Sequence, residues 1–243
     1  MRLVPKRVDW RRYFDELGKL PDDHAAVGRE LRPELAAVFS ATVASRLSAR
    51  VGERVLDAGC GTGVASAEIA KGGTWVAGLD LSRQMLLRTG LRTVNVVQGD
   101  VRNLPFTDQT FDRALFYSVV GHLDRKELRR ALEELWRVVR PGGTVLIGDV
   151  MDPKRALIWS AQRKLGLRRG LTVRMNAWLA RRLGRATWWY PQKEFQGMVA
   201  KIGFTTQLVA QDGRIPHSRY RYDCLAVRPT SPEVHGLQPD GRL

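Results

Sequence analysis

The chain has 243 residues and carries 40 Lys and Arg against 25 Asp and Glu, a formal net charge of +15 at pH 7. With 44% apolar and 27% charged residues, the composition is that of a globular protein and excludes a disordered chain or a disulfide scaffold. No run approaches the roughly 18 uncharged apolar residues of a membrane span, and the basic N-terminus lacks a signal peptide's apolar run. Two cysteines, Cys60 and Cys224, are too few for a disulfide scaffold and form no metal-type pair, so we expect a cytoplasmic protein, with peripheral attachment to a membrane left open.

Residues 1–50 are predicted to form an amphipathic helical segment with breaks at Pro21 and Pro33. Residues 51–150 then alternate short apolar runs with helical patterns. We predict strands at 54–59, 74–80, 94–100, 111–119 and 144–150, and helices at 64–73, 82–90 and 124–140. Ser82 and Asp124 are the expected N-caps of two of these helices. This alternation predicts an α/β fold with a parallel sheet covered on both faces.

Residues 151–190 interrupt the alternation with two basic helical stretches, which we interpret as a cap insertion. They hold ten Lys and Arg against one Asp, or nine of the fifteen net charges, and four of the seven tryptophans. The pattern resumes over 191–228 with a helix that begins at 192 and ends at Gly203, followed by strands at 205–210 and 222–228. The short link between these strands predicts antiparallel pairing. The Pro- and Gly-rich tail, 229–243, is predicted to be disordered.

A glycine loop in "RVLDAGCGTG", residues 54–63, follows the first predicted strand. Gly59 and Gly61 match the dinucleotide-binding fingerprint, but Val64 stands where its third glycine belongs, and no P-loop Lys follows. Asp57 lies at the carboxyl end of the strand, where open α/β sheets bind ligands. A carboxylate there suits a ligand with an amino group and would repel a pyrophosphate.

Five stretches in order make residues 50–228 resemble the class I S-adenosylmethionine-dependent methyltransferases. They are "VLDAGCGTG", "VAGLD", "QGDVRNLPF", "FDRALFYSVVGHL" and "LWRVVRPGGTVLIGD". The resemblance implies a Rossmann-like, seven-stranded, mostly parallel sheet with an antiparallel last strand, and S-adenosyl-L-methionine as cofactor. It implies that Asp80 holds the ribose hydroxyls and that Asp100 contacts the adenine. The cofactor-binding residues expected are Asp57, Gly59, Gly61, Gly63, Asp80, Leu81, Met85, Asp100, Val101 and Tyr117.

Each of these residues also has a plain structural interpretation. The glycines could form a tight turn, Asp80 could stabilise a helix N-terminus, and Asp100 could be a turn residue. Met85 suits core packing as well as adenine contact, because it lies on an apolar helix face.

The acceptor leaves fewer marks in the sequence. No [DNS]-P-P-[FYW] follows the fourth strand, no cysteine lies near that position, and no acidic pair indicates a metal. These absences argue against methylation of base amino groups, RNA pyrimidine carbons and catechol-type substrates. The resemblance favours a small-molecule or lipid-linked acceptor, with a hydroxyl oxygen as the first choice of atom. His122 and His217 are the candidate bases, and a structural role is the alternative for both.

Two further segments border the expected site. Relatives in the family have an aromatic N-terminal helix that closes over the cofactor, so Tyr13 is a candidate lid residue, although it shares an apolar face with Trp10, Phe14 and Leu17. The basic insertion suits an anionic membrane surface, the phosphates of a lipid-linked substrate or RNA, or merely solvent. An RNA methyltransferase and a non-catalytic S-adenosylmethionine-binding protein remain alternatives, and the oligomeric state is left open.

Overall fold

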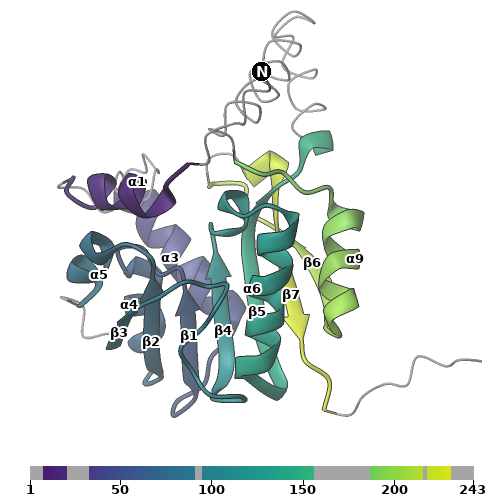
Figure 1. Ribbon diagram of the computed structural model, residues 1–243, viewed down its shortest axis with the longest axis horizontal. Coiled ribbons are helices and arrows are strands. Elements are labelled where there is room, and N and C mark those ends of the chain that lie inside the picture. The colour runs from purple at the N-terminus through teal and green to yellow at the C-terminus, as the bar shows by residue number, and fades with distance from the viewer. Residues whose placement is uncertain (1–7, 21–32, 91–94, 156–186, 216–217, 231–243) are drawn as a thin grey trace, which may run out of the picture.

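The computed structural model describes residues 8–20, 33–90, 95–155, 187–215 and 218–230. A seven-stranded sheet in the order β3-β2-β1-β4-β5-β7-β6 runs through the middle of the molecule (Figure 1). Strands β1 to β5 pair in parallel, and β7 is antiparallel to both of its neighbours, which confirms the predicted fold class. The strands are β1 Arg54–Ala58, β2 Trp75–Asp80, β3 Asn95–Gln98, β4 Phe111–Tyr117, β5 Val139–Met151, β6 Thr205–Ala210 and β7 Arg221–Val227.

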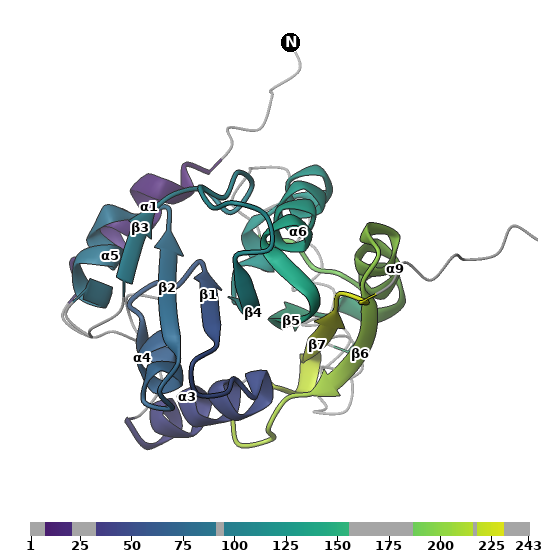
Figure 2. The same cartoon turned by 90° about the horizontal axis from the view of Figure 1, so that it is seen from below.

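Helices cover both faces of this sheet. Figure 2 shows α3 and α4 on one face and α6 and α9 on the other. Helix α5 packs against β2 and β3, and α1 contacts α5. The helices are α1 Trp10–Leu17, α3 Pro33–Leu47, α4 Val64–Ala70, α5 Arg83–Gly90, α6 Arg125–Val138 and α9 Gln192–Ile202, with short 3-10 turns η1 Val120–His122 and η2 Ser218–Tyr220.

Each face has its own hydrophobic core. On one face, Val43 and Leu47 of α3 pack with strand residues such as Val55 and Leu146. On the other, apolar residues of α6 and α9 pack on the alternate residues of the same strands. The two cores hold the central strands rigidly, so the loops at the strand ends have a fixed base.

Most predicted elements are present, and the predicted caps are confirmed. The Ser82 hydroxyl accepts from the Met85 amide at 3.2 Å, and Asp124 forms a capping box with Glu127 at the start of α6. The end of α6 differs from the prediction, because the helix stops at Val138 and β5 begins at once. Pro141 disfavours a helical conformation in the residue before it, so the "RPGG" stretch becomes a bulged strand start instead.

Several predictions fall largely outside the described residues. These are most of the basic insertion of 151–190, most of the tail of 229–243 and parts of the first fifty residues. At the C-terminal end of the insertion, the Trp188 amide donates to the Gly121 carbonyl at 2.6 Å, so this segment contacts η1. Of the helices that the structure describes, none is long and apolar enough to cross a membrane.

Candidate functional site

A pocket lies at the carboxyl ends of the central strands. β1 pairs with β2 on one side and with β4 on the other, so the order of the strands reverses at β1. Open α/β sheets bind ligands at this kind of switch point. The glycine loop, the ends of β2 and β4, the loop after β3, η1 and α1 all contribute lining residues. The motifs quoted above therefore meet in one place.

The backbone of the glycine loop shapes one wall of the pocket. Gly59 has φ +87°, and a Cβ there would lie 2.3 Å from a Val119 methyl group. Gly63 has φ +75° and precedes α4, and a Cβ there would lie 2.4 Å from a Thr89 methyl group. Gly59 and Gly61 line the pocket, whereas Gly63 packs against α5. Gly63 thus allows the loop to pack closely on α5, on the side away from the pocket.

Asp57 is a buried carboxylate on the floor of this pocket. Its exposed fraction is 3%, and the Ser66 hydroxyl donates to it at 2.5 Å. Burial, with a contribution from the charge of Asp80, raises the pKa of Asp57 to about 7. A cationic amino group of a ligand would stabilise the ionised form. Asp57 thus lies where the sequence analysis expects a carboxylate that suits a ligand's amino group.

Asp80 ends β2 and is held by backbone amides. Its Oδ2 accepts from the Gly61 amide and its Oδ1 from the Ser82 amide, both at 2.9 Å. Burial raises the pKa of Asp80. A carboxylate can accept about four hydrogen bonds, so capacity remains for a pair of hydroxyl donors. The geometry suits the predicted contact with a ribose diol.

Asp100 lies at another edge of the pocket and is bound by a residue that the sequence analysis missed. Arg102 Nε donates to Asp100 Oδ1 at 2.9 Å, and Arg102 Nη1 donates to Glu127 at 2.6 Å. Burial acts to raise the pKa of Asp100, but the hydrogen bonds from Arg102 lower it overall. The spacing of two residues between Asp100 and Arg102 was the only available signal. Arg102 holds Asp100 ionised and fixes its orientation.

The remaining predicted cofactor residues also line the pocket. Leu81, Met85 and Val101 contribute apolar surface between Asp80 and Asp100. Tyr117 contributes its ring, whereas its hydroxyl donates to Asp223 at 3.1 Å and accepts from Gln211 at 3.1 Å. Tyr117 is therefore a wall of the pocket whose hydroxyl is already engaged.

His122 lies in η1, directly after β4. Its ring centroid is 4.4 Å from that of Trp10 and 5.1 Å from that of Phe14. Burial lowers the pKa of His122 to about 4, although the charge of Asp149 acts in the opposite direction. Nδ1 is buried and has no hydrogen-bond partner among the described residues. The imidazole is thus neutral at pH 7 and can accept a proton. His217, the other candidate base, lies outside the described residues.

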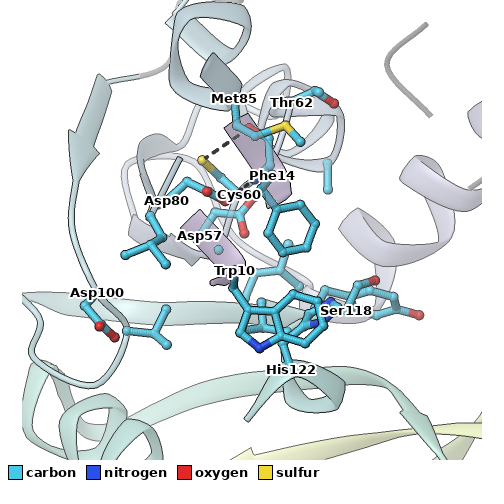
Figure 3. Close-up of a pocket in the computed structure, with 18 of the residues that line it drawn as sticks. Trp10, Phe14, Asp57, Cys60, Thr62, Asp80, Met85, Asp100, Ser118 and His122 are labelled. Atoms are coloured by element: carbon cyan, nitrogen blue, oxygen red, sulfur yellow. Dashed lines mark hydrogen bonds between the residues drawn. The ribbon is translucent and has the colours of Figure 1, made fainter. Parts of the chain in front are cut away.

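Helix α1 places two aromatic side chains in the pocket, as Figure 3 shows for Trp10 and Phe14 beside His122. Tyr13, the residue that the sequence suggested, is 47% exposed and does not line the pocket. Its neighbours on α1 take that place, because positions 10 and 14 share the face that points to the sheet. No pattern in the sequence distinguishes these aromatic residues from ordinary core residues.

A buried polar network lies under His122 and Tyr117. Asp223 is fully buried and accepts from Arg46, Tyr117, Gln211 and the backbone amide of Asp149. Arg221 in turn donates to both oxygens of Asp149 at 2.6 Å. This network ties the ends of β4, β5, β6 and β7 to α3.

Two adjacent strand ends carry unusual backbone conformations. Tyr117 and Gly148 are paired in register, and the residues that follow them, Ser118 and Asp149, have φ of +63° and +65°. Left-handed conformations are unfavourable outside glycine and collect at functional sites. Here the buried network below them holds both residues in place.

The chemistry of the described residues also bears on metals and thiols. Nowhere in the described ranges do three or more His, Cys, Asp or Glu side chains gather closely enough to hold a metal ion. Cys60 lines the pocket, and burial raises the pKa of its thiol. Cys224 is buried inside β7, and burial raises its pKa to about 12. Both thiols are therefore protonated at pH 7.

Comparison with known proteins shows that this chain is similar to methyltransferases. Residues 55–143 match the family described as a methyltransferase domain. A demethylmenaquinone methyltransferase of Corynebacterium kroppenstedtii is 37% identical over 151 residues, which is 62% of this chain and 64% of that protein. A malonyl-[acyl-carrier protein] O-methyltransferase of Erwinia pyrifoliae is 40% identical over 115 residues, 46% of this chain and 43% of that protein. The chain thus matches less than two thirds of the length of these curated relatives.

Among solved structures, magnesium protoporphyrin IX methyltransferase from Synechocystis PCC 6803 with bound SAH has the same fold. The TM-score is 0.64 at 18% identity, and the match covers 90% of this chain and 98% of that one. At this identity the likeness is one of architecture.

Proposed function

Because residues 55–143 match a methyltransferase-domain family and the chain is similar to curated methyltransferases, we propose that it is a class I S-adenosylmethionine-dependent enzyme that transfers a methyl group to a small-molecule or lipid-linked acceptor, at a hydroxyl oxygen. The names of the relatives support this acceptor class, since they refer to a menaquinone precursor and to an acyl chain on its carrier protein. The observation that carries the proposal is the neutral, unpartnered Nδ1 of His122 in the same pocket as Asp57 and Asp80.

The cofactor end of the pocket would hold S-adenosylmethionine through three kinds of contact. Asp57 would bind the amino group, Asp80 the ribose hydroxyls and Asp100 the adenine amino group, with Leu81 and Met85 against the adenine ring. When bound, S-adenosylmethionine supplies a methyl carbon activated by the positive charge on its sulfur. The contribution of this chain is then to align the acceptor and to remove its proton.

His122 is the residue that would remove the proton. Its neutral imidazole would accept the hydroxyl proton at Nδ1 as the oxygen forms its new bond to carbon. The negative charge of Asp149 would stabilise the imidazolium while it lasts. Because the pKa is low, the proton would pass on to solvent at neutral pH, which returns His122 to its starting state.

Incubation with methyl-labelled S-adenosylmethionine and a cell extract tests the acceptor class. After the reaction, the extract is split into lipid, small-molecule, polysaccharide and RNA fractions. We expect label in the lipid or small-molecule fraction. Label in RNA would contradict the acceptor class, and tight S-adenosylhomocysteine binding without any transfer would favour a non-catalytic binding protein.

His122→Ala tests the role of the base. We expect turnover to fall by roughly 10²–10⁴-fold while S-adenosylhomocysteine affinity stays unchanged, because only proton transfer is lost. The control is His122→Phe, which keeps an aromatic ring against Trp10 and Phe14 but cannot take the proton. A purely structural histidine would be rescued by Phe, whereas a base would not.

A further inference from the structure

The pocket that contains His122 is lined by aromatic rings from four different elements. Trp10 and Phe14 come from α1, Phe39 from α3 and Tyr117 from β4, and His122 belongs to η1. Phe39 and Tyr117 pack edge to face with their centroids 5.4 Å apart, and Trp10 and Phe14 both pack edge to face on His122. Such a surface favours flat, apolar ligands that offer a π-face or a ring edge.

The charges in the pocket disfavour an anionic acceptor. Its walls carry four carboxylates, on Asp57, Asp80, Asp100 and Glu127. Within the described ranges, Arg102 is the one Lys or Arg that lines the pocket, and it is bound between Asp100 and Glu127. Asp57, Asp80 and Asp100 would be engaged by the cofactor, so a carboxylate or phosphate on the acceptor would find no available cation among the described lining residues. This lining favours an uncharged acceptor.

Trp10 lies directly against His122, where an acceptor would have to approach Nδ1 (Figure 3). Helix α1 has no buried residue, so it is a peripheral element rather than part of the core. It is anchored at its C-terminal end, where Asp15 accepts from the Ser82 hydroxyl at 2.6 Å and Arg88 donates to the Gly18 carbonyl at 3.4 Å.

At the other end of the helix, the Trp10 side chain is held by ring contacts with Tyr13, Phe14 and His122. Ring contacts of this kind each contribute about 0.5–1.5 kcal/mol beyond the area they bury. A ligand ring that makes the same contacts can therefore replace the indole at little cost. The C-terminal anchor would keep the helix attached while its first turn moves.

From these observations we infer that the acceptor is an uncharged, planar aromatic ring bearing a hydroxyl group, and that it binds against His122 in the place of the Trp10 indole. The inference rests on the proposed function and narrows it to one class of acceptor. The ring stacks in the aromatic end of the pocket, and its hydroxyl reaches Nδ1 of His122. In the absence of an acceptor, the Trp10 indole occupies the acceptor site and keeps water away from His122; we call this its placeholder role.

Three probes of similar size test the acceptor class on the full chain saturated with S-adenosylhomocysteine. 2-Naphthol has the ring and the hydroxyl, 2-naphthoic acid has the ring with a carboxylate, and decahydro-2-naphthol has the hydroxyl without the aromatic ring. We expect calorimetry to give 2-naphthol an affinity at least about tenfold higher than either of the others. Equal or tighter binding of 2-naphthoic acid, or of the saturated alcohol, would overturn the inference.

Trp10→Ala tests the placeholder role, with Glu16→Ala as the control on the same helix. Because the indole no longer competes for the surface of His122, the affinity for 2-naphthol should rise by about threefold to tenfold in Trp10→Ala. It should be unchanged in Glu16→Ala, because the Glu16 side chain is exposed, is paired with Lys19 and does not line the pocket. Weaker binding in Trp10→Ala would show that Trp10 is a fixed wall and would overturn this part of the inference.

The first titration separates failure of the inference from failure of the proposed function. If S-adenosylhomocysteine does not bind, the proposed function is wrong. If it binds but 2-naphthol does not, only the inference about the acceptor is wrong. Imidazole NMR provides a second measurement on the unaltered chain, because 2-naphthol should shift the ring signals of His122.

Discussion

The two ends of the pocket are built in different ways. The cofactor end consists of backbone and carboxylates, held by hydrogen bonds such as those from Gly61 and Ser82 to Asp80. The acceptor end consists of aromatic side chains, and its outer part rests on a peripheral helix. One end is thus fixed by the fold, whereas the other can change its shape by movement or mutation of α1. The contrast teaches that cofactor and acceptor recognition can vary independently in this chain.

The largest effect is expected from a substitution that changes the backbone of the glycine loop at the cofactor end. Gly63→Ala places a Cβ at φ +75° and 2.4 Å from a Thr89 methyl group. Thr89 cannot turn away without cost, because its hydroxyl donates to the Gly61 and Met85 carbonyls. We expect a loss of roughly 2–5 kcal/mol in the free energy of unfolding, from backbone strain and overpacking together. Denaturant titration measures it.

Gly197→Ala in α9 is the matched control for Gly63→Ala. A Cβ there would meet nothing within 4 Å, and the residue is helical. We expect this variant to be about 0.5–1 kcal/mol more stable than the parent. If both variants behaved alike, the loop backbone would not dictate the cofactor end.

A second test removes a carboxylate and leaves the backbone intact. Asp80→Ala should weaken S-adenosylhomocysteine binding by about 30-fold or more, or about 2 kcal/mol, because a charge-assisted acceptor for two hydroxyls is lost. Asp112→Ala is the control, since this residue accepts from the Arg54 amide at the opposite end of β1. Unchanged affinity in Asp80→Ala, measured by calorimetry, would contradict the ribose assignment.

A third test compares the pH dependence of ligand binding at the two ends of the pocket. The folded chain keeps Asp57 protonated up to about pH 7, whereas its ordinary pKa is 3.8. The contribution of Asp57 to the free energy of unfolding therefore falls by about 1.4 kcal/mol per pH unit between these values and is constant above pH 7. A cationic amino group prefers the ionised form, so S-adenosylhomocysteine should bind about tenfold more tightly at pH 8 than at pH 6.

Asp57→Asn is the control for the pH experiment, because it removes the titrating group and should flatten the pH dependence. The affinity of 2-naphthol should vary little over the same range, because His122 titrates near pH 4. A pH-independent affinity of the parent for S-adenosylhomocysteine would contradict the role of Asp57.

The smallest expected effect concerns the anchor of α1. Asp15→Ala removes the acceptor for the Ser82 hydroxyl and the Gln84 amide at the start of α5. The loss of such a cap costs about 1 kcal/mol, so hydrogen exchange in α1 should become about fivefold faster. Glu16→Ala, an exposed neighbour paired with Lys19, should leave exchange unchanged. Equal rates in both variants would show that the acceptor end does not depend on this anchor.

The cofactor end could be predicted from the sequence because its determinants are local. Gly59, Gly61 and Asp57 lie within five residues, and Asp80 ends the next strand. Their spacing follows from one strand, one turn and one helix, which short-range patterns describe well. The order of strands and helices was predictable for the same reason.

The acceptor end could not be predicted in the same way, because it joins residues that are far apart in the chain. Trp10, Phe39 and His122 meet only in the fold, and an aromatic residue on a helix face carries no mark that separates pocket from core. Arg102 was missed since its role depends on Glu127 of α6. The buried network around Asp223 was missed because it depends on the pairing of β5, β6 and β7.

The alkylation rates of the two cysteines described above can report separately on opening of the pocket and on unfolding of the sheet. A thiol reacts with alkylating reagents as the thiolate, and burial suppresses that form at both positions. Cys60 becomes reactive when the ligand pocket opens, whereas Cys224 becomes reactive only when β7 leaves the sheet. The ratio of the two labelling rates, read by mass spectrometry, distinguishes breathing of the site from unfolding of the domain without any engineered label.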